Sequence, residues 1–177
     1  MAQTEGMDQM KNAAKTVSDL GCLATAARNI PVTGLAVDSR AVRPGYLFAA
    51  LPGHRVHGAD FISAALALGA TSILTDAAGV RRARSTLDGA KGICVWISED
   101  PRQALAAAAA LWFGAQPDTM VAVTGTNGKT SVASFVRQIW TEMGHSAINL
   151  GTNGVLGAWQ APLTHTTPEP ITLHDTL

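Results

Sequence analysis

The sequence has 177 residues, which is enough for one sizeable domain or two small ones. Hydrophobic residues make up 47% of the chain and charged residues 15%, the composition of a soluble globular protein. The formal net charge of zero gives no electrostatic reason to expect a nucleic acid or an acidic membrane surface as a partner. No apolar run approaches the roughly 18 residues that a membrane helix needs.

The N-terminal residues and the two cysteines indicate in which cellular compartment the protein is expected. Residues 1–16 mix acidic and basic side chains without an apolar core, so we expect a flexible leader and not a secretion signal. Cys22 and Cys94 stand alone in apolar surroundings without the spacing of metal ligands, which predicts two reduced, buried thiols. We therefore expect a cytoplasmic protein.

Residues 1–116 show the alternation of elements that is typical of an α/β domain. Short apolar runs bounded by turn residues predict strands at residues 34–38, 46–51, 71–75 and 92–97. A helix is predicted over residues 61–68, and an alanine-rich helix begins at Pro101 and ends at Gly114. The basic residues before the last strand are interpreted as a linker: Arg81, Arg82 and Arg84.

A second domain is expected over residues 117–177, because the pattern restarts after Pro117. A strand predicted at residues 120–124 leads into a glycine-rich loop, a helix follows and ends at Gly144, and another strand begins at residues 147–150. The helix carries one apolar stripe, formed by Val132, Val136, Ile139 and Met143. Strand, loop, helix and strand in this order are the context that a phosphate-binding loop requires.

The loop itself reads TGTNGKTS over residues 124–131. Gly125 and Gly128 allow a tight turn, and the amides at the start of the following helix can bind a phosphate. Lys129 would place a positive charge against the β and γ phosphates, and the Thr130 hydroxyl is a plausible Mg²⁺ ligand. Val123 stands where the longer phosphate loop has its first glycine, and we expect it to be a packing residue of the strand. The alternative is a plain glycine turn with a solvated lysine; the combined pattern favours ATP and Mg²⁺.

The short loop TGTNGKTS resembles the ATP site of the Mur ligase family. The segment VDSRAVRPGYLFAALPGHRVHGADF resembles the UDP-binding domain of these ligases, and INLGT at residues 148–152 and THTTP at 164–168 resemble the members that form the muramoyl tripeptide. The resemblance implies an α/β UDP-binding domain over residues 1–116, followed by the beginning of a P-loop-type ATP-binding domain over 117–177. It also implies an ATP-dependent amide ligase of peptidoglycan synthesis. Such an enzyme adds meso-diaminopimelate or L-lysine to UDP-N-acetylmuramoyl-L-alanyl-D-glutamate through an acyl phosphate.

The same resemblance assigns roles to individual residues. Lys129 would be catalytic and Thr130 would hold Mg²⁺. The ATP-binding set is Gly125, Thr126, Asn127, Gly128, Lys129, Thr130 and Ser131. The set that binds the UDP-muramoyl peptide is Val37, Ser39, His54, Arg55, Val56, His165, Thr166 and Thr167.

Three alternative interpretations remain open. Asp38, Ser39 and Arg40 could form only a turn cap, and residues 166–168 only an extended connector before proline. His54 and His57 could be a pair of metal ligands, although no third ligand stands nearby in the sequence.

The function has two alternatives as well: the ligase that adds D-alanyl-D-alanine, and a non-catalytic nucleotide-binding module. We expect the substrates to be a UDP-muramoyl dipeptide and an amino acid, with no nucleic acid or membrane partner, and the protein to be a monomer. The later Mg²⁺ ligands, the carboxylated lysine and the amino-acid-selecting domain of the family are not among these residues. We therefore expect the 177 residues alone to be incomplete and inactive as a ligase.

Overall fold

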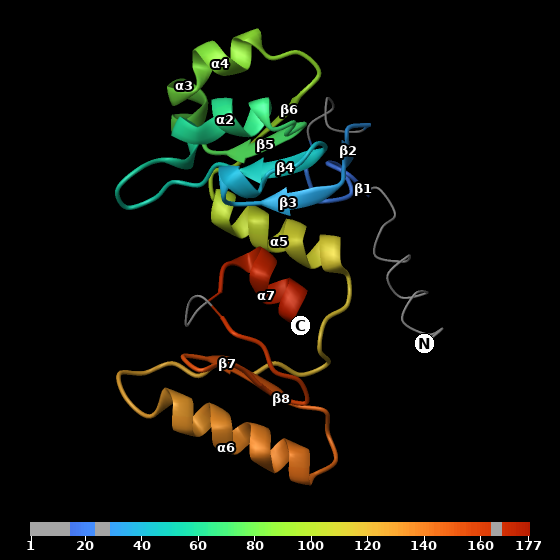
Figure 1. The fold of residues 1–177 in the computed structure, drawn as a ribbon, viewed down its shortest axis with the longest axis vertical. Helices are drawn as coiled ribbons and strands as arrows, with labels where there is room; N and C mark the ends of the chain where they lie inside the picture. The colour runs from blue at the N-terminus through green and yellow to red at the C-terminus, as the bar shows by residue number, and fades with distance from the viewer. Residues whose placement is uncertain (1–14, 24–28, 164–167) are drawn as a thin grey trace. The chain divides into compact units, whose positions relative to one another are not determined.

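The computed structural model describes residues 15–23, 29–163 and 168–177. The chain divides into two compact units, one up to Ala115 and one from Gln116 onward. Residues 1–14 of the expected leader lie outside the described residues, whereas Lys15 and Thr16 form the short strand β1 (Lys15–Thr16). Each unit is described on its own (Figure 1).

The first unit contains a parallel sheet of β3 (Gly34–Ala36), β4 (Tyr46–Ala49), β5 (Ser72–Thr75) and β6 (Cys94–Ile97), in that spatial order. Every neighbouring pair is parallel, with Leu47 beside Ser72 and Ser72 beside Cys94. A separate antiparallel pair joins β1 to β2 (Pro31–Val32). The α/β fold and the strands predicted from the sequence are confirmed, although each strand is shorter than its predicted range.

Helices connect the strands of this sheet. The connections contain the 3₁₀ turns η2 (Ser39–Ala41) and η3 (Gly58–Phe61), and the helices α2 (Ile62–Ala67), α3 (Ala77–Arg82) and α4 (Arg84–Gly89). Helix α5 (Pro101–Phe113) follows β6 and covers the opposite face of the sheet (Figure 1). The predicted basic linker is wrong, because its arginines lie in α3 and α4. Asp76 caps the start of α3 by accepting a hydrogen bond from the Gly79 amide at 2.6 Å.

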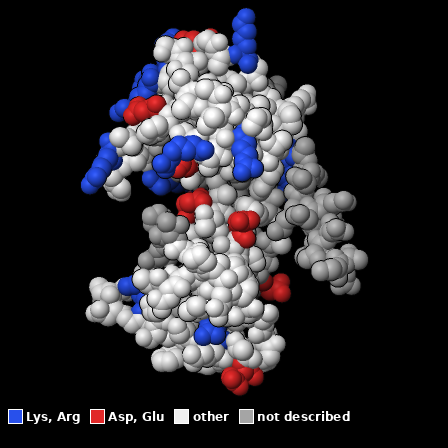
Figure 2. Space-filling view, in the orientation of Figure 1, with Lys and Arg blue, Asp and Glu red and all other residues white. Residues whose placement is uncertain are grey.

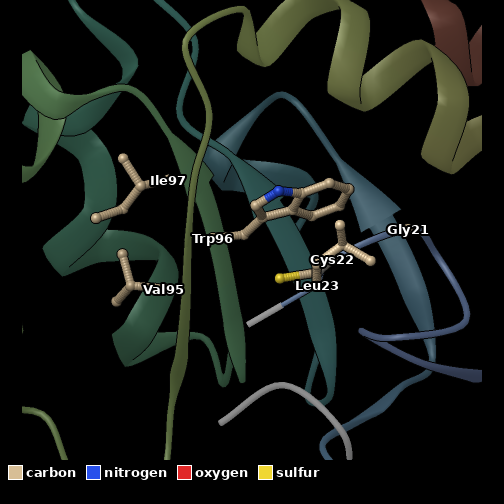
Figure 3. A pocket seen from close by; sticks show the side chains of 6 residues that line it. All are labelled: Gly21, Cys22, Leu23, Val95, Trp96 and Ile97. Carbon is tan, nitrogen blue, oxygen red and sulfur yellow. The ribbon is translucent and has the colours of Figure 1, made fainter. Parts of the chain in front are cut away.

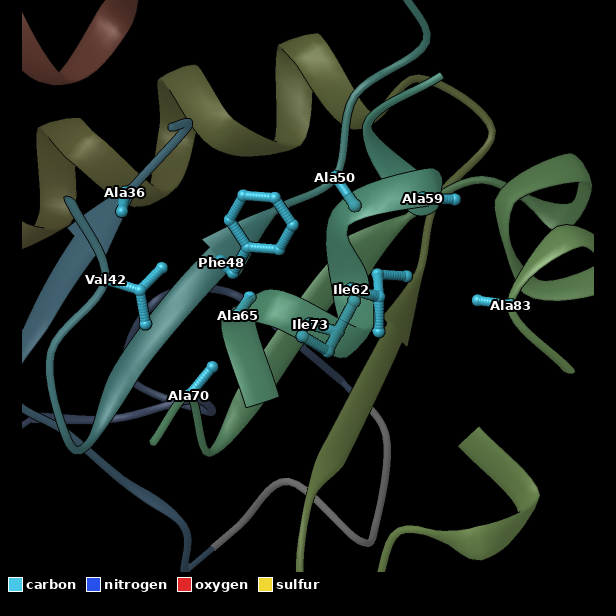
Figure 4. Packing of buried hydrophobic residues seen from close by; sticks show 10 residues of the cluster. All are labelled: Ala36, Val42, Phe48, Ala50, Ala59, Ile62, Ala65, Ala70, Ile73 and Ala83. Atoms are coloured by element: carbon cyan, nitrogen blue, oxygen red, sulfur yellow. The ribbon is translucent and has the colours of Figure 1, made fainter. Parts of the chain in front are cut away.

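The core of the first unit lies on both faces of the sheet. On the side of α2 and α3, Phe48 and Ile73 from adjacent strands are 1% and 0% exposed and pack with Ile62 (Figure 4). Consecutive strand residues point to opposite faces, so the fully buried Leu47 and Leu74 point to the other side, where α5 contacts β5. Burial on both faces explains why the strands are continuous apolar runs in the sequence.

The second unit contains α6 (Lys129–Glu142), the antiparallel strands β7 (Ile148–Gly151) and β8 (Gly154–Gly157), and α7 (Pro170–Thr176). Helix α6 lies against β7, and the Arg137 Nε donates a hydrogen bond to Asn149 Oδ1 at 2.9 Å. The helix and the first strand of the hairpin agree with the sequence predictions. Strand β8 and helix α7 were not predicted.

Two predictions for this unit are wrong. Residues 120–124 form no strand, because no strand of the described residues pairs with them, and Met120 and Val121 are more than half exposed. Val123 is accordingly half-buried and not a core residue of a strand. An apolar stripe on a helix is expected to face the core, yet three members of the α6 stripe are exposed: Val132, Ile139 and Met143.

Candidate functional site

The phosphate loop in the second unit ends where α6 begins. Gly128 is the N-cap residue, with the positive φ of 79°, and Gly125 has a φ of 142°. The first intrahelical bond runs from the Val132 amide to the Gly128 carbonyl at 3.0 Å, and no side chain caps the helix. The amides of the first turn are therefore uncapped, and their binding of a phosphate stays a prediction.

Lys129 lies over the same loop. Its Nζ donates hydrogen bonds to the Gly125 carbonyl and, at 3.4 Å, to the Thr126 carbonyl. To reach a phosphate, this ammonium group must exchange the loop carbonyls for phosphate oxygens. The predicted nucleotide ligands are all exposed: Gly125, Thr126, Asn127, Gly128, Lys129, Thr130 and Ser131.

The donor set of the loop fits a nucleoside triphosphate. Backbone amides and an ammonium group donate hydrogen bonds to phosphate oxygens, and the loop supplies both. The hydroxyl of Thr130, the second residue of α6, can coordinate Mg²⁺. Within the described residues, no group of three or more His, Cys, Asp or Glu side chains could hold a metal ion. Thr130 as a Mg²⁺ ligand therefore stays a prediction.

We expect Gly128→Ala to distort the loop and to weaken ATP binding. A Cβ at position 128 would meet no atom within 4 Å, so its cost comes from the left-handed backbone, about 1–2 kcal/mol. Gly144 is a matched control, because it has a φ of 87°, has the same open surroundings and lies beyond the other end of α6. Both alanine variants should lower the free energy of unfolding similarly in urea, and only Gly128→Ala should weaken ATP in a titration. Equal ATP affinity in both variants would contradict the loop assignment.

The predicted substrate-binding segments of the first unit lie at the carboxyl edge of the parallel sheet. Val37 and Ser39 follow β3, and the segment 54–56 follows β4. Since β3 and β4 are adjacent and parallel, both segments leave the sheet at the same edge. This edge is where open α/β sheets bind ligands.

The turn after β3 is capped by its own aspartate. Asp38 accepts hydrogen bonds from the Arg40 amide at 2.9 Å and from the Arg40 guanidinium, whose Nη2 lies 2.6 Å from Oδ2. These bonds from Arg40 lower the pKa of Asp38 to about 2. The turn-cap interpretation of residues 38–40 is therefore correct as far as Asp38 and Arg40 are concerned. Val37 and Ser39 are half-buried beside this cap, and their contact with substrate stays a prediction.

The loop after β4 presents a different set of side chains. His54, Arg55 and Val56 are exposed. Within the described part of the chain, the Arg55 guanidinium has no hydrogen-bond or ion-pair partner, unlike the guanidinium of Arg40. An unpaired, exposed guanidinium suits a diphosphate, which it can bind through two parallel hydrogen bonds.

Two family comparisons decide the affiliation of the chain. Residues 31–113 match the family described as "Mur ligase family, catalytic domain", and residues 123–177 match "Mur ligase middle domain". The chain belongs to the Mur ligase family. The boundary between the compact units, after Ala115, lies between the two matches.

Curated relatives narrow the likeness within the Mur ligases. The chain is 49% identical over 146 residues to the UDP-N-acetylmuramoyl-L-alanyl-D-glutamate--2,6-diaminopimelate ligase of Bradyrhizobium diazoefficiens, covering 82% of this chain and 28% of that protein. A protein of the same name from Caulobacter vibrioides is 52% identical over 125 residues, covering 71% of this chain and 24% of the relative. The chain thus spans less than a third of the length of these relatives.

A solved structure supports the Mur ligase fold. The structure of a UDP-N-acetylmuramoyl-L-alanyl-D-glutamate--2,6-diaminopimelate ligase aligns with a TM-score of 0.71 at 24% identity, over 92% of this chain and 32% of that chain. At this identity the likeness concerns the fold alone. Of the residues that the Mur ligase resemblance assigned to the muramoyl peptide, His165, Thr166 and Thr167 lie outside the described residues.

Sequence reasoning missed three residues at the carboxyl edge of this Mur ligase sheet. His57 lies 3.2 Å from Asp76, which follows β5, and Arg102 Nη2 donates a hydrogen bond to the Pro52 carbonyl at 2.6 Å. Both nitrogens of His57 are engaged within the chain, so it does not form the metal pair with His54 that was considered. The signal was present in the sequence, since Asp76 and Arg102 both closely follow strands that were predicted.

Some of the charged side chains of the first unit form ion pairs at the surface. Arg82 lies 3.4 Å from Asp60, and Arg84 lies 3.5 Å from Asp88 on α4. Figure 2 shows Lys and Arg side chains of this unit with Asp and Glu side chains among them. None of the helices in the described residues is long and apolar enough to cross a membrane.

An apolar pocket in the first unit contains none of the predicted site residues. It is lined by Gly21, Cys22 and Leu23 and by Val95, Trp96 and Ile97 of β6. Figure 3 shows Trp96 directed toward Cys22, whereas Val95 and Ile97 point away on the other side of the strand.

The two cysteines are both buried and free, as predicted. They are not isolated from each other, because burial, together with the neighbouring Cys22 thiol, raises the pKa of Cys94 to about 11. Cys94 is therefore a protonated, unreactive thiol at neutral pH.

Proposed function

We propose that this chain supplies the UDP-substrate-binding domain and the beginning of the ATP-binding domain of an ATP-dependent amide ligase. The ligase adds meso-diaminopimelate to UDP-N-acetylmuramoyl-L-alanyl-D-glutamate in peptidoglycan synthesis. The observation that carries the proposal is the uncapped, glycine-initiated start of α6 with Lys129 beside it, within a Mur ligase middle-domain match. Both relatives described above carry the diaminopimelate name, which favours this amino acid over L-lysine and this reaction over D-alanyl-D-alanine addition.

The chemistry assigned to the loop is phosphoryl transfer followed by acyl transfer. A carboxylate oxygen of the muramoyl peptide attacks the γ-phosphorus, the bond to the ADP oxygen breaks, and an acyl phosphate forms. The amine of the amino acid then attacks the acyl carbon, phosphate leaves, and the nitrogen loses a proton. Lys129 and the loop amides hold the phosphate oxygens and offset the negative charge that builds between two anions. Mg²⁺, held in part by Thr130, would neutralise further phosphate charge when bound.

The substrate is assigned to the carboxyl edge of the first unit. Arg55 binds the diphosphate, Val37 and Ser39 contact the uridine end, and His54 and Val56 lie over it. His165, Thr166 and Thr167 are assigned to the muramoyl peptide on the Mur ligase resemblance alone. We further propose a cytoplasmic monomer; its two buried, unpaired thiols suit a reducing compartment. The 177 residues alone are expected to bind substrate without forming the amide bond.

Titration of the chain with UDP-N-acetylmuramoyl-L-alanyl-D-glutamate tests this assignment. We expect Arg55→Ala to weaken binding about 10- to 100-fold, because a charge-assisted bond to a phosphate contributes about 1.5–3 kcal/mol. Ser39→Ala should weaken binding by a smaller factor, about 5-fold, because it removes one neutral hydrogen bond. Arg43→Ala is the matched control, since Arg43 is exposed but precedes β4, at the amino edge of the sheet.

The outcomes separate the proposal from its alternatives. Parent-like binding in both Arg55→Ala and Ser39→Ala would show that this edge is not the substrate site. A non-catalytic nucleotide-binding module would bind ATP in a parallel titration and show no binding of the UDP-muramoyl peptide. Weakening by Arg43→Ala as strong as by Arg55→Ala would indicate a general charge effect.

A further inference from the structure

The loop of residues 52–57 after β4 is closed at its base. Pro52 and His57 form an antiparallel bridge, and the Gly58 amide donates a hydrogen bond to the Leu51 carbonyl at 2.8 Å. The Pro52 carbonyl also accepts the bond from Arg102. The exposed residues between these ends, His54, Arg55 and Val56, are therefore carried on a short span with fixed ends.

The His57 ring holds one side of this base. Its Nδ1 accepts a hydrogen bond from the Ala59 amide at 3.0 Å, and its Nε2 lies 3.2 Å from Asp76 Oδ1. Because Nδ1 is the acceptor, Nε2 carries the hydrogen and donates it to the carboxylate. The His57 side chain is only 9% exposed, and both ring nitrogens are hydrogen-bonded within the chain, so neither is free for a ligand.

Asp76 fixes the other end of this contact. The same Oδ1 that receives the His57 bond accepts the Gly79 amide at 2.6 Å, which anchors the carboxylate to the start of α3. The Gly79 bond lowers the pKa of Asp76, so it is a carboxylate at neutral pH. Position 79 must be small: a Cβ there would lie 2.9 Å from His57 Cε1 and 2.1 Å from Thr75 Oγ1. The imidazole therefore packs directly on the backbone of α3.

We propose that His57 and Asp76 form a latch that ties the loop of residues 52–57 to the end of β5 and holds Arg55 in place for the diphosphate of the substrate. His57 and Asp76 are assigned as positioning residues, because in this proposal they act on the substrate only through Arg55. The proposal rests on the proposed function, since it assigns the loop to the UDP-muramoyl peptide. A latched loop loses less conformational freedom on binding than a free one, so opening the latch should weaken binding without removing any substrate contact.

Two variants open the latch while keeping the local caps. His57→Asn retains a side-chain oxygen for the Ala59 amide but is too short to reach Asp76. Asp76→Ser retains an oxygen for the Gly79 amide but cannot reach His57. Asp76→Asn is the conservative variant, because its amide oxygen can accept both bonds. Arg82→Ala is the matched control, since it removes an exposed ion pair to Asp60 on η3 without touching the latch.

Amide hydrogen exchange and substrate titration are measured on the same proteins. We expect both opened variants to exchange the amides of residues 54–59 about 10-fold faster and to bind UDP-N-acetylmuramoyl-L-alanyl-D-glutamate about 10-fold more weakly. The double variant His57→Asn with Asp76→Ser should bind no more weakly than either single variant, because both remove one interaction. Asp76→Asn and Arg82→Ala should match the parent in both measurements.

Unchanged exchange in the opened variants would overturn the latch itself. Faster exchange with parent-like affinity would overturn its positioning role. A parent chain that binds no UDP-muramoyl peptide would overturn the proposed function, and with it the positioning role, while the exchange data would still decide whether the latch holds the loop. The two failures are therefore distinguishable.

Discussion

Replacing Lys129 by alanine is expected to lower the turnover of a full-length ligase carrying this sequence by about 100- to 1000-fold, the usual loss for one group that stabilises developing charge. The ammonium group is the only side-chain cation within the loop of residues 124–131. In the transfer step it would lie between the γ-phosphate and the attacking carboxylate, two anions that repel each other. Stabilisation that is stronger in the transition state than in the ground state appears in kcat. We therefore expect kcat to fall further than the affinity for ATP.

The measurement is steady-state kinetics with ATP, the UDP-muramoyl dipeptide and the amino acid. Lys91→Ala is the control, because Lys91 is also exposed but lies in the first unit, after α4. Near-normal turnover in Lys129→Ala would mean that this loop is not the phosphate site. A loss confined to the KM for ATP would instead assign Lys129 to ground-state binding only.

The sequence predicted the first unit well because its elements depend on local signals. Apolar runs between turn residues located all strands of the parallel sheet, and Pro101 and Gly114 bounded α5. Helices α3 and α4 were missed because their clustered arginines were interpreted as a linker between strands. The cap that starts α3 depends on the Asp76 side chain, a cue that the sequence did contain.

The second unit shows where local signals fail. Residues 120–124 have a strand composition, but a strand requires a pairing partner, and none of the described residues provides one. The helical stripe of α6 was recognised by its period, yet periodicity predicts which residues share a face and not what covers that face. Three of its members, Val132, Ile139 and Met143, are exposed accordingly.

The sequence indicated candidate ligand-binding residues, but it did not indicate the residues that hold their loops in place. The motif at residues 124–131 and the segments at 37–39 and 54–56 supplied the side chains that we propose contact phosphates and uridine, and those contacts stay predictions. The contact of His57 with Asp76 spans 19 residues of sequence, and that of Arg102 with Pro52 spans 50 residues. Both contacts depend on the order of the strands in the sheet. Parallel pairing of β4 with β5 brings the ends of these strands together, which a linear pattern does not state.

The largest stability effect in the first unit is expected from Phe48→Ala. Phe48 is 1% exposed in the centre of the sheet and packs with Val42 and Ile73 in the cluster of Figure 4. Truncation of a buried phenylalanine costs about 3–5 kcal/mol, because apolar contacts are lost and a cavity remains. That is a large part of the roughly 5–15 kcal/mol that stabilises a typical domain. Phe61→Ala is the matched control, since Phe61 is 44% exposed and should cost about 1 kcal/mol or less.

Urea unfolding measures both variants in the same unit when it is followed by the fluorescence of the half-buried Trp96 in a background where Trp112, Trp140 and Trp159 are replaced by phenylalanine. Because β4 runs directly into the loop of residues 52–57, Phe48→Ala should reduce the amount of binding-competent protein and leave the affinity of the folded fraction unchanged. Saturating UDP-muramoyl dipeptide should then restore stability, by about 2.7 kcal/mol at 100 times Kd, since ligand binds the folded state. A Phe48→Ala loss no larger than that of Phe61→Ala would contradict the core assignment. A stable Phe48→Ala protein with weakened affinity would instead mean that Phe48 shapes the loop directly.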